Sequence, residues 1–356
     1  MEKLELFDKV FEIQRKGKEC SNDELDELLR QYPDKFYRYQ KFTNDNIETL
    51  KSKCAYFSCP NTWPDKTDAT MLFDIDKDKS MLEENQKAYV VEYSKSLFSA
   101  AARLTNREPI SYDSFEKIYD DCVINGEFDE NRAYDILKEE IGIGKAESVI
   151  KKFEKEQNKM RIQVEKSLEQ LTAINSLRDR MAVLCLSENY DNENQWDKYA
   201  AGGKGFCIEY TINFSSVDEP FKSSCLPILY GMKTPLSILD YIRERIDCLG
   251  DKKKENEFIN RLAYQGIKSF FTKDSTFAGE CEWRFSLQEK YKNSNVSFPF
   301  ATRIILGNNM SSHNEKRLQN IANKLKIDVY KRSLDATKSK WNYYLVRKNK
   351  DNEGNE

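Results

Sequence analysis

Carboxylates, arginines and hydroxyl groups are the side chains of this chain that could carry out chemistry. Glu280 and Glu282 stand two positions apart in a stretch that alternates like a β-strand, so we expect both carboxylates on the same face. Arg38 and Ser187 lie in two further strand-like stretches. His313 is the only histidine among the 356 residues. A Ser-His-Asp triad, a Cys-His dyad or a multi-histidine zinc site is therefore not expected.

Composition narrows the class of protein further. The nine cysteines include no C-x-x-C pair, so we expect reduced, mostly buried thiols and no metal site. The net charge of −3 differs from that of a strongly basic nucleic-acid binder. The first residues form a charged amphipathic stretch, and no run approaches the ~20 apolar residues of a membrane span. We expect a soluble, cytoplasmic protein that does not contact a membrane.

The pattern predicts an α+β fold with one central mixed or antiparallel sheet. A helical extension over 1–32 precedes a single domain over 33–347, which carries a helical insertion at about 80–178, and a charged tail follows over 348–356. The run 181–187 is apolar without alternation, which is typical of a buried central strand.

Alternating or continuous apolar patterns locate the other elements. Strands are predicted over 36–42, 55–58, 206–210, 226–230, 280–287, 302–306, 327–330 and 341–346. Helices are predicted over 47–52, 94–104, 143–177, 195–200, 235–272 and 315–325.

An ordered set of short motifs resembles a prokaryotic family known as domain of unknown function 2971. The motifs run from about residue 36 to 346 and comprise Tyr37-Arg38-Tyr39, Ala55-Tyr56-Phe57-Ser58 with Asn61 and Asp65, Leu184-Cys185-Leu186-Ser187-Glu188, Trp196-Asp197-Lys198-Tyr199-Ala200 with Gly205-Phe206-Cys207-Ile208, Glu280-Cys281-Glu282-Trp283-Arg284, and Ile304-Ile305-Leu306-Gly307. The family usually has Asn-Asp-Pro in the second motif, where this chain has Asn61-Thr62-Trp63-Pro64-Asp65.

The stretch from Tyr37 to Ser58 is also similar to the first strand-helix-strand of DNA-targeting ADP-ribosyltransferase toxins. That resemblance implies an ADP-ribosyltransferase-like fold with an Arg on the first strand, a Ser on a middle strand and a Glu late in the chain. Arg38, Ser187 (or Ser58) and Glu282 occur in that order, and Glu280 completes a Glu-x-Glu pair. It implies NAD as a substrate, without a metal.

The chemistry of NAD cleavage fits these residue types. An arginine can hold the diphosphate with two hydrogen bonds. A carboxylate beside the ribose stabilises the positive charge that develops as the nicotinamide bond breaks. Glu282 and Glu280 are the expected catalytic carboxylates, with Ser187 beside them, and Arg38 and Ser58 are expected at the cofactor. Tyr37, Tyr39 or Trp196 could stack on nicotinamide.

Structural roles could account for the same residues. Glu280, Glu282 and Arg284 could form an ion-pair ladder on one sheet face, and Ser187 could cap a turn. Arg38 could pair on the surface, and Trp196 could belong to the core.

The leading hypothesis is an NAD-dependent ADP-ribosyltransferase-like enzyme, an antiviral-defence effector or toxin that modifies a protein or nucleic-acid acceptor and is restrained by an inhibitory partner protein. One alternative is a non-catalytic module that binds a nucleotide or a nucleic acid. The other is a metal-independent nuclease.

Overall fold

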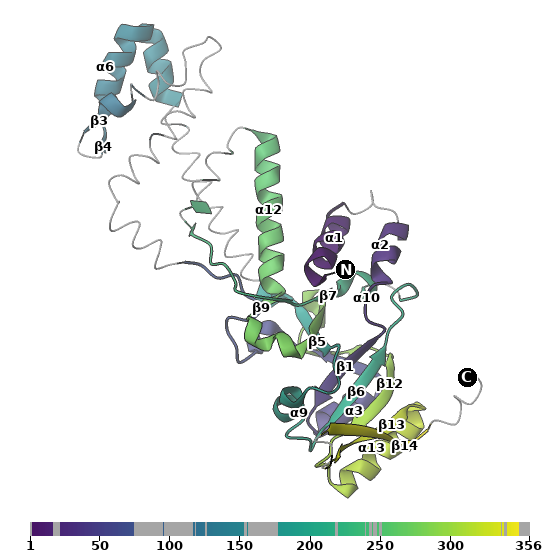
Figure 1. Ribbon diagram of the computed structural model, residues 1–356. Coiled ribbons are helices and arrows are strands. Elements are labelled where there is room, and N and C mark those ends of the chain that lie inside the picture. Colours follow the sequence, from purple (N-terminus) through teal and green to yellow (C-terminus); the bar gives the residue numbers. More distant parts are fainter. Residues whose placement is uncertain are drawn as a thin grey trace. The chain divides into compact units, whose positions relative to one another are not determined.

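The computed structural model describes most of the chain (Figure 1). The described residues are 2–16, 22–74, 95, 117, 119–124, 127–152, 155, 177–217, 220–238, 240–241, 244, 248, 251–335, 337 and 340–348. The chain divides into two compact units. The first comprises Met1–Thr70, Leu177–Lys233 and Lys268–Glu356, and the second comprises Met71–Ser176 and Thr234–Ile267.

An eight-stranded mixed sheet forms the centre of the first unit, in the order β14-β13-β12-β6-β1-β5-β10-β7. Its pairs are antiparallel except for the parallel pair of β12 and β13. The strands are β1 (Lys35–Gln40), β5 (Ala182–Ser187), β6 (Phe206–Thr211), β7 (Cys225–Pro227), β10 (Glu282–Leu287), β12 (Ala301–Leu306), β13 (Asp328–Asp335) and β14 (Lys340–Arg347). The predicted combination of helices with a large mixed sheet is confirmed.

Two small sheets and several helices complete the first unit. The small sheets pair β2 (Cys54–Phe57) with β11 (Ser294–Ser297) and β8 (Leu229–Tyr230) with β9 (Thr272–Lys273). The helical elements are α1 (Lys3–Lys16), α2 (Asn22–Leu29), α3 (Asn44–Lys51), η2 (Pro60–Thr62), α8 (Leu177–Arg180), α9 (Glu193–Tyr199), α10 (Phe221–Ser224), η3 (Ser275–Glu280), η4 (Glu289–Tyr291) and α13 (Ser312–Leu325).

The second unit has its own small core. Its described elements include the hairpin of β3 (Val123–Ile124) and β4 (Glu127–Phe128), α6 (Glu130–Ile141) and most of α12 (Lys252–Phe270). Buried Tyr241, Phe258 and Leu262 pack together, with Phe73 against them. The residues 143–152 are helical, as predicted, whereas the predicted helix 94–104 and most of the proposed insertion at 80–178 lie outside the described residues.

The predicted central strand is confirmed. In β5, Leu184 is 0% exposed, and the strand lies between β1 and β10. Aromatic side chains of one sheet face pack beside it: the ring centroid of Phe36 lies 5.7 Å from that of Trp283 and 6.4 Å from that of Phe285. Their edge-to-face geometry favours close packing of large rings.

Some element boundaries differ from the prediction because capping residues set them. Thr43 caps α3 by accepting a hydrogen bond from the backbone N–H of Asn46, so the helix begins earlier than the predicted residue 47. Ser311 likewise caps α13, so this helix begins at Ser312, before the predicted residue 315. The predicted strand 226–230 is divided between β7 and β8, which belong to different sheets.

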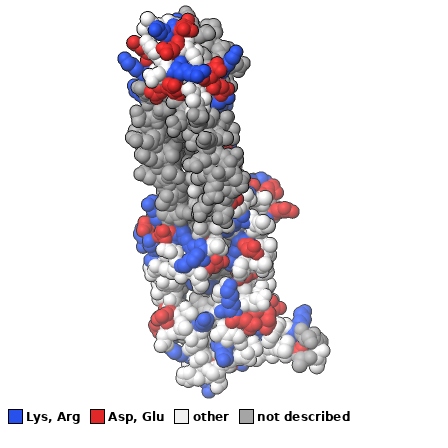
Figure 2. Space-filling model, turned by 90° about the vertical axis from the view of Figure 1, so that its left-hand side faces the viewer, with Lys and Arg blue, Asp and Glu red and all other residues white. Residues whose placement is uncertain are grey.

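The surface carries charges of both signs. On the face drawn in Figure 2, Lys and Arg side chains alternate with Asp and Glu over the described residues, in keeping with the net charge of −3. None of the described helices combines the length and the apolar character that crossing a membrane requires.

A charge introduced into β5 should unfold the first unit. Leu184→Asp places an unpaired carboxylate where the side chain is 0% exposed, and we expect a loss of about 4 kcal/mol or more in the free energy of unfolding, seen as insoluble protein or a strongly lowered urea midpoint. Leu345→Asp is the matched control, because Leu345 on β14 is 44% exposed. Equal behaviour of the two variants would contradict the central position of β5.

Candidate functional site

A gap opens in the middle of the eight-stranded sheet. β5 and β1 share a single register pair, Tyr37 with Ser187. Val183 lies four residues before Ser187 on β5, and Ser58 pairs with it on the same edge of the strand. The N–H of Ser58 donates to the carbonyl of Val183 at 3.0 Å, and the carbonyl of Ser58 accepts from the N–H of Val183 at 2.8 Å. Because backbone groups alternate between the edges of a strand, those of Cys185 point into the gap between these two bridges.

A cleft of about 220 Å³ occupies this gap. Its lining comprises Tyr37, Arg38, Tyr39, Ser58, Val183, Cys185, Leu186, Ser187, Gln195, Tyr199, Glu280 and Glu282. Seven of the eight residues proposed from the sequence as catalytic or cofactor-binding lie around this cleft, and Trp196 does not.

The expectation that Glu280 and Glu282 share one strand is wrong. Glu280 ends η3, and β10 begins at Glu282. Cys281, between them, has left-handed backbone angles (φ 45°, ψ 49°), which interrupt the alternation of a strand. The two carboxylates nevertheless meet, because Lys273 Nζ donates to Glu280 Oε2 at 2.5 Å and to Glu282 Oε2 at 3.0 Å.

Arg284 binds the other oxygen of Glu282. Its Nε donates to Glu282 Oε1 at 2.7 Å, and its Nη2 donates to Asp68 Oδ1 at 2.8 Å. The Nη1 atom donates to the carbonyl of Phe270 at 2.9 Å. Arg284 is 0% exposed, so each of these bonds replaces water that the guanidinium loses on folding. The ion-pair interpretation of Glu282 and Arg284 therefore describes their contacts correctly.

These contacts set the protonation of the cluster. Burial opposes the ionisation of Glu282, but the positive charges of Arg284 and Lys273 outweigh burial and lower the pKa of Glu282 from 4.5 to about 2. Burial likewise opposes the charge on Lys273, yet Glu282 and Glu280 raise the pKa of Lys273 above its usual value. At neutral pH, Glu282 is therefore a carboxylate and Lys273 is an ammonium group.

A second buried arginine shapes the loop that follows β2. The Arg178 guanidinium donates to the carbonyl of Pro60 at 3.1 Å and to that of Asp65 at 2.6 Å. This loop contains Asn61–Asp65, the motif that departs from the family pattern, and it leads to Asp68 at Arg284. The loop thus supplies an anion to the buried ion pairs.

Arg38 reaches the cleft from the opposite side of the sheet. Strand alternation puts Tyr37, Ser187 and Glu282 on one face and Arg38 on the other. Arg38 Nη2 donates to the carbonyl of Tyr56 at 3.1 Å, whereas its Nη1 is buried without a hydrogen-bond partner among the described residues. Arg38 and Glu282 line the same cleft only because the sheet is open between them.

The two serines make structural hydrogen bonds. Ser187 Oγ donates to the carbonyl of Glu280 at 2.7 Å and accepts from the N–H of Asn189 at 3.0 Å, as a turn cap does. Ser58 Oγ accepts from Trp63 Nε1 at 2.9 Å. Both hydroxyls therefore fix the walls of the cleft.

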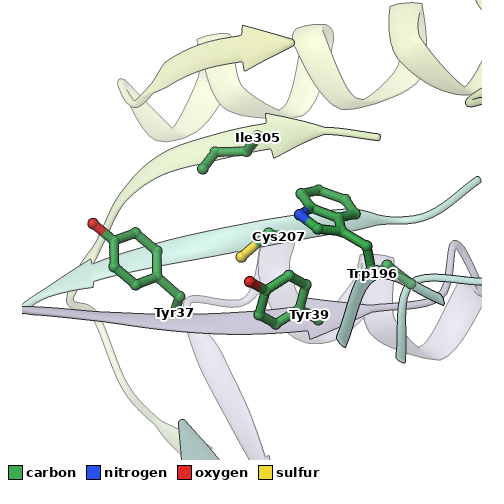
Figure 3. Close-up of a cluster of buried hydrophobic side chains, with 6 residues drawn as sticks. Tyr37, Tyr39, Trp196, Cys207 and Ile305 are labelled. Atoms are coloured by element: carbon green, nitrogen blue, oxygen red, sulfur yellow. The ribbon is translucent and has the colours of Figure 1, made fainter. Parts of the chain in front are cut away.

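Trp196 belongs to the core and does not fit the predicted stacking role. It is 0% exposed, and its Nε1 donates to the carbonyl of Tyr190 at 2.9 Å. Figure 3 shows its ring among Tyr39, Cys207 and Ile305, with the ring of Tyr39 5.2 Å away and perpendicular to it. The hydroxyl of Tyr39 donates to the carbonyl of Asn189 at 2.7 Å, so that ring is fixed as well.

Sequence reasoning missed Gln195, Tyr199 and Lys273. The first two lie one helical turn apart on α9, and this i, i+4 spacing could have indicated a common face. Tyr199 donates from its hydroxyl to Glu280 Oε1 at 3.1 Å. Lys273 lies on a two-residue strand, and no local pattern marks it.

The charged side chains that line the cleft are those of Arg38, Glu280 and Glu282. In the part of the chain that the structure describes, no group of three or more His, Cys, Asp or Glu side chains is arranged to hold a metal ion.

Comparison with known proteins adds a family of unknown function. Residues 195–285 match the model of a family described as protein of unknown function (DUF2971), which confirms the first resemblance for this segment. The matched segment contains Gln195, Tyr199, Glu280 and Glu282 from the cleft lining. Neither a curated protein nor a solved structure matches the chain.

Removing the charge of Glu282 should change both stability and its pH dependence. Because the folded-state pKa is depressed from 4.5 to about 2, this carboxylate stabilises the fold above pH 4.5, and the contribution disappears as the pH falls towards 2. We expect Glu282→Gln to cost about 3 kcal/mol at pH 7 and to flatten the acid limb of stability between pH 5 and 2, as measured by urea unfolding.

Glu48→Gln provides the comparison, because Glu48 pairs with Lys51 on an exposed surface. Such a pair contributes about 0–1 kcal/mol. If Glu282→Gln were as mild as Glu48→Gln, the buried network would not stabilise the fold.

Proposed function

We propose that the cleft binds NAD as a substrate and that the chain transfers ADP-ribose from NAD to a macromolecular acceptor, a protein or a nucleic acid. The observation that supports this function is the convergence of Arg38, Ser187, Glu280 and Glu282 on one cleft. These residues come from segments that are far apart in the sequence. They match the residue types and order of the ADP-ribosyltransferase resemblance, which also suggests a role as a defence effector or toxin with an inhibitory partner protein.

The size of the cleft limits how NAD would lie. A volume of about 220 Å³ is below the usual range of pockets for whole small molecules, roughly 300–1,000 Å³. The cleft suits one nucleoside-sized half of NAD, and the remainder would extend outside it. We assign the nicotinamide riboside half to the cleft, because the carboxylates line it.

The contacts favour Glu280 as the carboxylate that faces the ribose. Both oxygens of Glu282 are bound by Arg284 and Lys273, and the residue is only 5% exposed. The Glu280 side chain is slightly more exposed, at 11% against 7%, and its oxygens are bound by the Tyr199 hydroxyl and by Lys273 and not by the buried Arg284. As the bond between nicotinamide and ribose C1′ breaks, its electron pair leaves with nicotinamide, and Glu280 would stabilise the cation left on the ribose. A lone pair of a nucleophilic atom of the acceptor then forms the new bond to C1′, and the proton of that atom is released to solvent.

A binding module without catalysis is the second candidate. The hydrogen bonds that occupy Ser187 Oγ and both oxygens of Glu282 favour it, because these groups are committed to the fold. This candidate predicts nucleotide binding without consumption of NAD.

Glu280→Gln separates the two candidates. Loss of one preorganised electrostatic group typically costs roughly a hundred- to thousand-fold in rate, and we expect a loss of that size in NAD consumption, measured with purified protein and cell extract as acceptor. The melting temperature should fall less than in Glu282→Gln, because only Glu282 is bound by the buried Arg284. If the wild-type protein binds NAD without consuming it, the binding module is supported and the transferase is rejected. If the wild-type protein does not bind NAD, both candidates are rejected as NAD-binding proteins.

Arg38→Gln tests the expected contact between Arg38 and the diphosphate of NAD. A charge-assisted hydrogen bond contributes about 1.5–3 kcal/mol, so the dissociation constant for NAD should rise about ten- to hundredfold in calorimetry. Arg30→Gln is the control, since Arg30 is exposed and does not line the cleft. An unchanged dissociation constant in Arg38→Gln would remove Arg38 from the site.

A further inference from the structure

Gln195, which lines the cleft, has a buried hydrogen-bond acceptor without a partner among the described residues. The residue is 6% exposed and lines the cleft, and its Oε1 has no hydrogen-bond partner among the described residues. An unsatisfied buried acceptor costs about 1–3 kcal/mol, so a ligand that donates a hydrogen bond to it gains that free energy. A ligand in the cleft that carries a hydrogen-bond donor could therefore satisfy Gln195 Oε1.

The orientation of this amide follows from its other contact. Gln195 Nε2 donates to the carbonyl of Glu280 at 3.3 Å, and Ser187 Oγ donates to the same carbonyl at 2.7 Å. Exchange of the amide oxygen and nitrogen would direct Oε1 at a carbonyl oxygen, which is repulsive. Oε1 is consequently the atom left for a ligand.

Hydrogen bonds at the start of α9 set the position of Gln195 relative to η3. Gln195 lies in the first turn of α9, where its N–H donates to Oδ1 of the capping Asn192 at 3.0 Å. Asn192 Nδ2 in turn donates to the carbonyl of Gly279 at 2.5 Å, which ties the start of α9 to η3. A fixed acceptor discriminates between ligands better than a mobile one, because it cannot turn away from a mismatched group.

We propose that Gln195 is a specificity-determining residue that selects the neutral carboxamide of nicotinamide and rejects the carboxylate of nicotinic acid. An N–H of the carboxamide can donate to Oε1, whereas a carboxylate has no donor at neutral pH and would face an acceptor. This inference rests on the proposed function, which places the ribose at Glu280. Gln195 donates to the backbone carbonyl of that same residue, which brings its amide close to the group attached to ribose C1′ in the proposed pose.

Two mononucleotides that differ only in this group test the inference. Nicotinamide mononucleotide and nicotinic acid mononucleotide would be titrated calorimetrically into the purified full chain. We expect wild type to prefer the amide about ten- to hundredfold. Gln195→Met keeps similar length but removes the acceptor, and it should bind the two ligands within about threefold of each other. Gln288→Met, at an exposed glutamine, should retain the wild-type preference.

The possible results separate the two proposals. Wild type that binds both mononucleotides equally well would overturn the role of Gln195 while leaving the proposed function intact. Wild type that binds neither these ligands nor NAD would overturn both. Because the preference is measured on wild type, its absence would overturn the role of Gln195 even if Gln195→Met fails to fold. A wild-type preference that persists in folded Gln195→Met would assign selection to another residue.

Discussion

The buried guanidinium of Arg284 is the constraint on which the site depends. A cation that is 0% exposed must have its hydrogen-bonding capacity filled by the protein, because leaving it unpaired is strongly destabilising. Glu282, Asp68 and the carbonyl of Phe270 accept its hydrogen bonds. The ring centroid of Trp63 lies 5.0 Å from Arg284 Cζ. One side chain therefore fixes the start of its own strand, the loop after β2 and the end of α12 relative to one another.

A chain of ion pairs leads from Arg284 and Glu282 to the cleft. Because Arg284 takes one oxygen of Glu282, the other is free for Lys273, which also binds Glu280. Charges of alternating sign thus lead from the core to the partly exposed carboxylate. Two neighbouring carboxylates would repel each other without Lys273, so the ammonium group is a condition for having both at the site.

Local sequence patterns correctly predicted the strands whose formation depends on the apolar or alternating character of their own residues. The apolar run of β5 was sufficient because both faces of that strand are buried, and the alternation of aromatic and polar residues was sufficient to identify β1 as a strand, although most residues on both of its faces are buried. Glu280 was misplaced because a left-handed Cys281 interrupts the strand, and nothing in Glu-x-Glu reveals a backbone angle. Trp196 was assigned to the ligand although burial by Tyr39 and Ile305 places it in the core. The contribution of Lys273 depends on tertiary contacts and has no local signal.

The single pair between Tyr37 and Ser187 makes the junction of β1 and β5 a seam in an otherwise continuous sheet. Two subsheets meet there: β7, β10 and β5 on one side, and β1, β6, β12, β13 and β14 on the other. A pulling force across the seam would meet far fewer backbone hydrogen bonds than one across β1 and β6, which share six register pairs. The first unit should therefore fracture mechanically along this line, with each subsheet retaining its own ladder.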